Sequence, residues 1–112
     1  MKIEKQVKGD VSILRLDGDL VGGPNAQLVH DTIKQIIAEK KTKVLVDMGK
    51  VVIVNSTGLG ILIAALTSMK GAGGALKLLN VSKRVASLLM VTKLNLIFEV
   101  FDDEEKALAS FA

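Results

Sequence analysis

The chain lacks cysteine, tryptophan and tyrosine, and it has one proline, one histidine and three phenylalanines among 112 residues. Without cysteine there are no disulfides or thiolate metal sites, and His30 alone is too little for a protein-built zinc site. We therefore predict no metal and no cofactor. With 49% hydrophobic residues and few aromatics, the core must be aliphatic, and the length suits one domain spanning residues 1–112.

The net charge is small, +3 at pH 7, and the basic residues form no continuous block. This is a weak electrostatic footprint for nucleic acid, so we predict no nucleic-acid partner. The opening residues, MKIEKQVKGD, are too charged for a secretory signal, because no apolar run follows the first lysines. Together these features predict a cytoplasmic protein.

Long hydrophobic runs are also scarce, and the one uncharged stretch extends from Val51 to Met69 between Lys50 and Lys70. It nearly reaches the length that spans a bilayer. A cluster typical of turns interrupts it near its start: Asn55, Ser56, Thr57, Gly58 and Gly60. We therefore predict a short β-branched strand at 51–54, a turn, and a helix beginning after Asn55, with no direct insertion into a membrane.

The first half of the chain alternates between strand and helix patterns. Apolar residues alternate with polar ones on both sides of Gly9 and Asp10, which predicts an N-terminal β-hairpin. Pro24 suits the first turn of a helix that ends near Lys40 or Lys41. The run Val44–Val46 predicts a strand buried on both faces. Residues 47–50 are predicted to leave the strand and form a looser connection to Val51.

The second half continues this alternation. We predict a strand from Ala75 to Leu79, a helix capped by Asn80 or Ser82, and a last strand at 96–98. Asp102 and Glu105 resemble a capping box for a closing helix, whose apolar face holds Ala107, Leu108 and Phe111. The pattern predicts an α/β fold with a mixed central β-sheet, an N-terminal hairpin and about four α-helices.

The glycines fit no phosphate-binding or hydrolase motif. No Gly-Lys-Ser/Thr string exists, and the dinucleotide pattern fails because GLGILI ends on Ile63 and GAGGAL ends on Leu76. A nucleophile elbow needs glycine two residues before the serine, where this chain has Val54. We therefore predict that the protein is not an enzyme. An N-cap worth about 1 kcal/mol explains one of the three adjacent polar residues, but not all three.

The segment NSTGLGIL, Asn55 to Leu62, resembles the phosphoacceptor motif of bacterial anti-sigma factor antagonists, in which an Asp-Ser-Ser/Thr-Gly-Leu-Gly string opens a helix after a buried strand. The resemblance extends along nearly the whole chain and implies a stand-alone STAS domain. It is carried by matches that fall in the expected order: GDL at 18–20, Ala26, Leu28, VLVDM at 44–48, Gly73, Gly74, Leu89, TKL at 92–94, Ala107 and Leu108.

This resemblance implies a partner switch. The unmodified antagonist binds an anti-sigma factor that is also a serine kinase, which frees the sigma factor, and phosphorylation reverses the binding. By position the acceptor is Ser56, with Thr57 the less favoured neighbour. ATP and magnesium belong to the kinase, and a phosphatase of the PP2C type removes the phosphate. One departure is that the family usually has aspartate where this chain has Asn55.

The predicted partner surface surrounds that helix start. Small or apolar residues occupy one side of the helix, and they suit either a partner protein or packing against a neighbouring helix of the same domain. Two glycines in the loop before the first helix are expected to flank the same surface. The predicted partner-binding residues are Gly22, Gly23, Asn55, Ser56, Thr57, Gly58, Ile61 and Ala65.

Two other functions stay open at this stage, together with the oligomeric state. The domain would alternatively be a STAS subunit of a lipid-transport assembly or of a stress-sensing, stressosome-like assembly. A small-ligand or nucleotide-binding module is the second alternative, although no phosphate loop supports it.

Overall fold

The computed structural model describes residues 1–112, which form a five-stranded sheet in the order β1-β2-β3-β4-β5. The strands are β1 (Lys2–Lys8), β2 (Val11–Asp17), β3 (Lys43–Lys50), β4 (Ala75–Leu79) and β5 (Val100–Phe101). β1 and β2 form an antiparallel hairpin, whereas β2, β3, β4 and β5 pair in parallel. The predicted mixed sheet with an N-terminal hairpin is confirmed.

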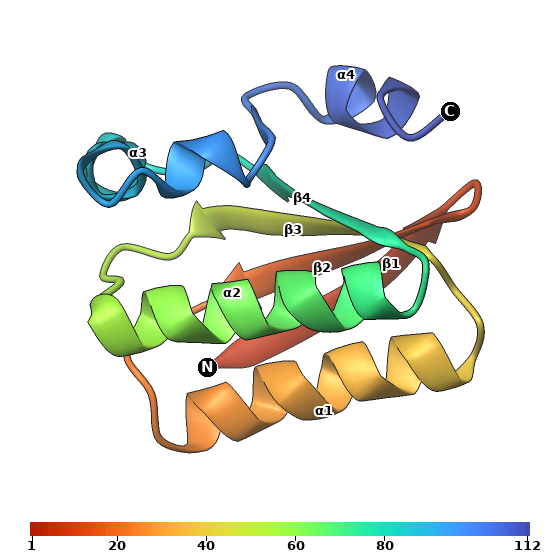
Figure 1. The fold of residues 1–112 in the computed structure, drawn as a ribbon, viewed down its shortest axis with the longest axis horizontal. Coiled ribbons are helices and arrows are strands. Elements are labelled where there is room, and N and C mark those ends of the chain that lie inside the picture. The colour runs from red at the N-terminus through yellow and green to blue at the C-terminus, as the bar shows by residue number, and fades with distance from the viewer.

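The four helices are α1 (Pro24–Ala38), α2 (Ser56–Gly71), α3 (Lys83–Val91) and α4 (Glu104–Ala109), with a short 3-10 helix η1 (Leu94–Leu96) after α3. α1 and α2 lie along one face of the sheet, and α4 lies on the opposite side (Figure 1). Pro24 is in the first turn of α1, and the Ser82 side chain caps α3 by accepting a hydrogen bond from Val85 N, both as predicted. The predicted number of helices is confirmed.

The core lies on both faces of the sheet because successive strand residues point to opposite sides. In β3, Val44 and Val46 contribute to the large cluster under α1 and α2, whereas Leu45 packs with Ala107 and Phe111 of the C-terminal segment. This explains why Val44–Val46 is an uninterrupted apolar run: the strand is buried on both faces.

The predicted end of β3 was wrong. The strand continues to Lys50, because Asp47 pairs with Leu79 of β4 and Lys50 pairs with Asp17 of β2. Residues 51–54 therefore do not form the predicted strand; the chain turns at Val51 through a hydrogen bond to Met48 O, and only Val54 makes an isolated bridge, to Leu20.

Two predictions near the C-terminus were also wrong. Residues 96–98 are not a strand, because the left-handed Lys93 (φ 62°) reverses the chain into η1 and the last strand comes later, at Val100–Phe101. The cap of α4 is Asp103 rather than Asp102: its extended backbone lets the carboxylate accept a hydrogen bond from Lys106 N at 3.0 Å.

An ionic cluster fixes the start of α4 to the sheet. Arg15 Nη1 donates to both Glu104 and Asp47 at 2.8 Å, and Lys8 also pairs with Glu104. The hydrogen bond from Arg15, followed by that from Lys8, lowers the pKa of Glu104, and the same bond to Glu104 raises the pKa of Arg15. Because the exposed fractions of these side chains range from 15% for Asp47 to 43% for Lys8, solvent screens the cluster, and it directs packing more than it adds stability.

Candidate functional site

Asn55 supplies the N-cap of α2. Its side-chain oxygen accepts a hydrogen bond from Gly58 N at 2.9 Å, and its backbone is extended. Ser56 and Thr57 are therefore the first two helical residues, both are exposed, and neither hydroxyl makes a hydrogen bond within the chain. The cap accounts for one polar residue of the three, and it leaves the Ser56 hydroxyl free at the positive end of a 16-residue helix.

The loop before α1 lies against this helix start. Leu20 N donates to Ile53 O at 2.9 Å, and Asn55 Nδ2 donates to Val21 O at 3.4 Å. Gly22 lies beside Thr57, because a Cβ on this glycine would be 2.9 Å from Thr57 Cγ2, and its φ of +109° also disfavours other residues. Of the two predicted neighbours, Gly22 therefore lies next to the start of α2, whereas Gly23 is the N-cap residue of α1 and a Cβ there would meet nothing within 4 Å.

Gly58 is buried under that loop and offers no open surface. A Cβ at this position would lie 1.8 Å from Leu20 O and 3.0 Å from Val54 Cγ1. Of the two explanations for a small residue here, packing within the domain accounts for Gly58.

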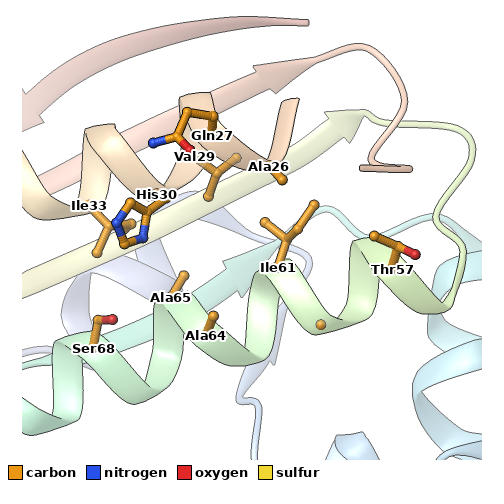
Figure 2. A pocket seen from close by; sticks show the side chains of 11 residues that line it. Ala26, Gln27, Val29, His30, Ile33, Thr57, Ile61, Ala64, Ala65 and Ser68 are labelled. Carbon is orange, nitrogen blue, oxygen red and sulfur yellow. The ribbon is translucent and has the colours of Figure 1, made fainter. Parts of the chain in front are cut away.

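Ile61 and Ala65 face α1 rather than open solvent. Between the two helices runs a groove of about 350 Å³, and Figure 2 shows Ile61 pointing from α2 toward α1 across it. Thr57 lies at the end of the groove nearest the helix start, so the groove and the Ser56 region are continuous along α2. The groove is lined by Ala26, Gln27, Val29, His30, Ile33, Thr57, Gly60, Ile61, Ala64, Ala65 and Ser68.

Exposed aliphatic side chains near Ser56 were not predicted from the sequence. Val21, Val52 and Ile53 are 40%, 64% and 43% exposed. Val52 and Ile53 belong to the predicted strand at 51–54, but β3 ends before them and their side chains are exposed. No local sequence signal distinguishes them from the buried Val51 and Val54, because their exposure depends on where the pairing of β3 ends.

Few charged groups are held close to this surface. The segment from Val51 to Met69 contains none, and the carboxylate bonded to this segment belongs to Asp19, whose Oδ1 accepts from Ile53 N at 3.4 Å. No cluster of three or more metal-ligating side chains occurs in the structure, and none of its helices is long and apolar enough to cross a membrane. The chemistry available at the site is therefore that of a free hydroxyl, backbone N–H groups and apolar contacts.

The Asn55 cap gives a first prediction. Asn55→Asp keeps an acceptor for Gly58 N and adds a negative charge at the helix start, so the free energy of unfolding should stay within about 0.5 kcal/mol of the original or rise. Asn55→Ala removes the acceptor and should cost about 1 kcal/mol. Urea unfolding of the three proteins measures both values, and equal stability of the alanine variant would contradict the assigned cap.

A family model and several solved structures match nearly the whole chain. The STAS domain family model matches residues 2–107. An anti-sigma factor antagonist from Mycobacterium paratuberculosis is similar in structure, with a TM-score of 0.84, 18% identity, and coverage of 98% of this chain and 92% of that chain. The Bacillus cell fate determinant SpoIIAA in its phosphorylated form has a TM-score of 0.77 and 17% identity, covering 99% and 100% of the two chains.

A protein from another functional context has a similar structure. The sulfate transporter family protein from Wolinella succinogenes has a TM-score of 0.72 and 25% identity, with coverage of 95% of this chain and 88% of that chain. At these identities the Mycobacterium paratuberculosis protein and SpoIIAA establish a shared fold, and the α/β fold predicted from the sequence is the one that they share with this chain.

Proposed function

The chain belongs to the STAS domain family, and on that basis we propose that it is a cytoplasmic anti-sigma factor antagonist without catalytic activity of its own. Its unphosphorylated form binds an anti-sigma factor that is also a serine kinase and thereby releases the sigma factor. Phosphorylation of Ser56 ends this binding, and a phosphatase of the PP2C type restores it. The observation that carries the proposal is the free, exposed Ser56 hydroxyl at the start of α2, beside a cap that Asn55 already provides.

The position of Ser56 suits a switch that acts on binding rather than on folding. A phosphate adds about −1.5 to −2 charges, which the positive end of α2 and its unpaired N–H groups tolerate. The exposed Val21, Val52 and Ile53 provide apolar contact area around it. A partner that covers these side chains must desolvate the phosphate, so modification weakens the complex while the domain stays folded.

The proposed partner surface combines the start of α2 with the loop before α1. Asn55 and Thr57 flank the acceptor in the chain, Gly22 lies beside Thr57, and the adjacent Gly23 is included with it. Ile61 and Ala65 extend the proposed surface along the groove between α1 and α2. Gly58 contributes indirectly, because its missing side chain lets the Leu20 backbone approach the helix start.

Phosphate transfer from a candidate host kinase tests this function. We expect one phosphate on the unmodified sequence by intact mass after incubation with kinase, ATP and magnesium, no phosphate on Ser56→Ala, and one phosphate on the matched Thr57→Ala variant. Release from the kinase should accompany the modification. A phosphate that persists on Ser56→Ala, or a protein that no candidate kinase binds or modifies, contradicts the proposal.

A STAS subunit of a lipid-transport or stress-sensing assembly is the second candidate function. The structural similarity to the sulfate transporter family protein favours a transport assembly among these. In that case Ser56 serves structure or regulation within the assembly. Co-purification distinguishes the two functions, because an antagonist brings down a small kinase, whereas a subunit brings down the components of its assembly.

A further inference from the structure

Residues 102–112 form a cover on one side of the sheet, which we name the C-terminal strap. The strap consists of α4 with a short segment on either side of it, and it lies on the opposite side of the sheet from α1 and α2 (Figure 1). A helix of six residues does not keep its conformation alone in water, so α4 depends on its contacts with the sheet.

Few apolar contacts attach the strap. Ala107 and Phe111 are its only buried side chains, and they belong to a small cluster that is separate from the main core. The other buried side chains of that cluster come from β2, β3 and β4: Val11, Ile13, Leu45 and Leu79. The main core under α1 and α2 contains no residue of the strap, so the strap can leave the sheet without opening that core.

Two polar clamps hold the strap against the strands. Near its start, Glu104 accepts a hydrogen bond from Arg15 at 2.8 Å and also pairs with Lys8. Near its end, Lys77 Nζ donates to Ser110 O at 3.0 Å and to Ser110 Oγ at 2.9 Å. The strap is therefore attached at two points, one on each side of its buried alanine.

Each clamp uses a cation that keeps another partner when the strap leaves. Arg15 donates to Asp47 at 2.8 Å as well as to Glu104. Lys77 also pairs with Glu99 at 3.3 Å, and Glu99 precedes β5 and lies outside the strap. Opening of the strap therefore replaces its bonds by contacts with water without leaving either cation unpaired, which avoids the largest cost of breaking a part-buried ion pair.

The chain has a boundary at Asp102, between β5 and α4. β5 is joined to β4 by hydrogen bonds from Leu78 N to Glu99 O at 2.9 Å and from Asn80 N to Phe101 O at 2.8 Å. Asp102 is exposed and belongs to no helix or strand. β5 can therefore stay paired with β4 while the residues that follow it move.

We propose that the C-terminal strap opens as a unit about Asp102 while the sheet, α1, α2 and α3 stay folded. Opening breaks both clamps and uncovers the apolar strand residues of the small cluster. Because the Glu104 clamp is part-exposed, salt screens it and favours the open strap. This motion lies on the side of the sheet away from α2 and does not depend on the function proposed for Ser56.

Amide hydrogen exchange of the full chain, followed residue by residue by NMR, tests this opening. The N–H groups of Ala107 and Ser110 report on the strap, because they are bonded within it to Asp103 O and Lys106 O. Relative to the rates of an unstructured chain, we expect these two amides to exchange at least about tenfold faster than the slowest amides of β3. Exchange of both amides as slow as in β3 overturns the proposal, because the strap would then open only when the whole domain unfolds.

Ile36→Val distinguishes opening of the strap from global unfolding. Ile36 is fully buried in the main core, so this variant should speed exchange of the slowest β3 amides about fivefold. The amides of Ala107 and Ser110 should keep their rates, because the strap has no part in that core. Equal acceleration of both sets of amides overturns the proposal.

Glu104→Gln tests the first clamp, because glutamine keeps the shape of the side chain and removes its charge. We expect exchange at Ala107 and Ser110 to become about threefold faster. Raising NaCl from about 0.05 M to about 0.5 M should have a similar effect on the original protein and little effect on the variant. Glu105→Gln is the matched control, because this neighbouring carboxylate is exposed and forms no ion pair. Unchanged exchange in Glu104→Gln, or equal acceleration in Glu105→Gln, overturns the clamp as the contact that holds the strap.

Discussion

Replacing Gly58 with alanine is expected to lower the free energy of unfolding by about 3 kcal/mol. The new Cβ would lie 1.8 Å from Leu20 O, well inside any tolerable contact. Leu20 has no room to retreat, because its side chain is fully buried, its N–H is bonded to Ile53 O, and it bridges to Val54. The steric clash can therefore be removed only by moving the start of α2 or the loop before α1.

Gly60→Ala is the matched control, because Gly60 lies in the same helix and a Cβ there would meet nothing within 4 Å. Alanine is the better helix former, so this variant should be more stable by about 0.5 to 1 kcal/mol. Urea unfolding of both variants measures the difference. If the two substitutions change the free energy of unfolding equally, the close approach of Leu20 O is not the reason that position 58 requires glycine.

Ser56→Glu is expected to weaken binding to the anti-sigma factor about 100-fold while leaving the fold intact. The carboxylate is favoured at the positive end of α2, so the free energy of unfolding should change by less than about 0.5 kcal/mol. In the complex the same charge lies among the exposed Val21, Val52 and Ile53, and the partner must desolvate it. Calorimetric titration and urea unfolding of one preparation measure both effects.

Thr67→Glu provides the control for added charge, because Thr67 is an exposed hydroxyl residue of α2 beyond its first turn. Its affinity for the anti-sigma factor should stay within about threefold of the original. Equal weakening by the two substitutions would mean that net charge, rather than the position of Ser56, controls the complex, and the switch would lose its structural basis.

The asparagine that replaces the family's aspartate before Ser56 allows the stability of the fold to be distinguished from recognition by the kinase. Asn55 makes the capping bond that an aspartate would also make, so the fold does not need the carboxylate. If the kinase uses that carboxylate, Asn55→Asp accelerates phosphate transfer without a matching gain in stability. In the proposed switch, the departure from the family motif would then affect the rate of phosphate transfer, while Asn55 keeps the capped geometry of the helix start.

Patterns among neighbouring residues determined most of the elements. Alternation around Gly9, the proline at the start of α1 and the apolar run of β3 each reflect local conformation or burial, and each lies in the predicted type of element, although β3 is longer than predicted. The same kind of local pattern indicated that α2 begins after Asn55.

Contacts between distant parts of the chain decided the rest. The sequence by itself determined the alternation of strands and helices and the position of Ser56 at a helix start, because those depend on residues a few positions apart. Only the tertiary structure decided that β3 continues to Lys50, that Val52 and Ile53 are exposed, and that Leu20 requires a glycine at position 58. These features arise from strand pairing and close packing between segments that are far apart in the sequence. A pattern among neighbouring residues does not show which distant segments will meet.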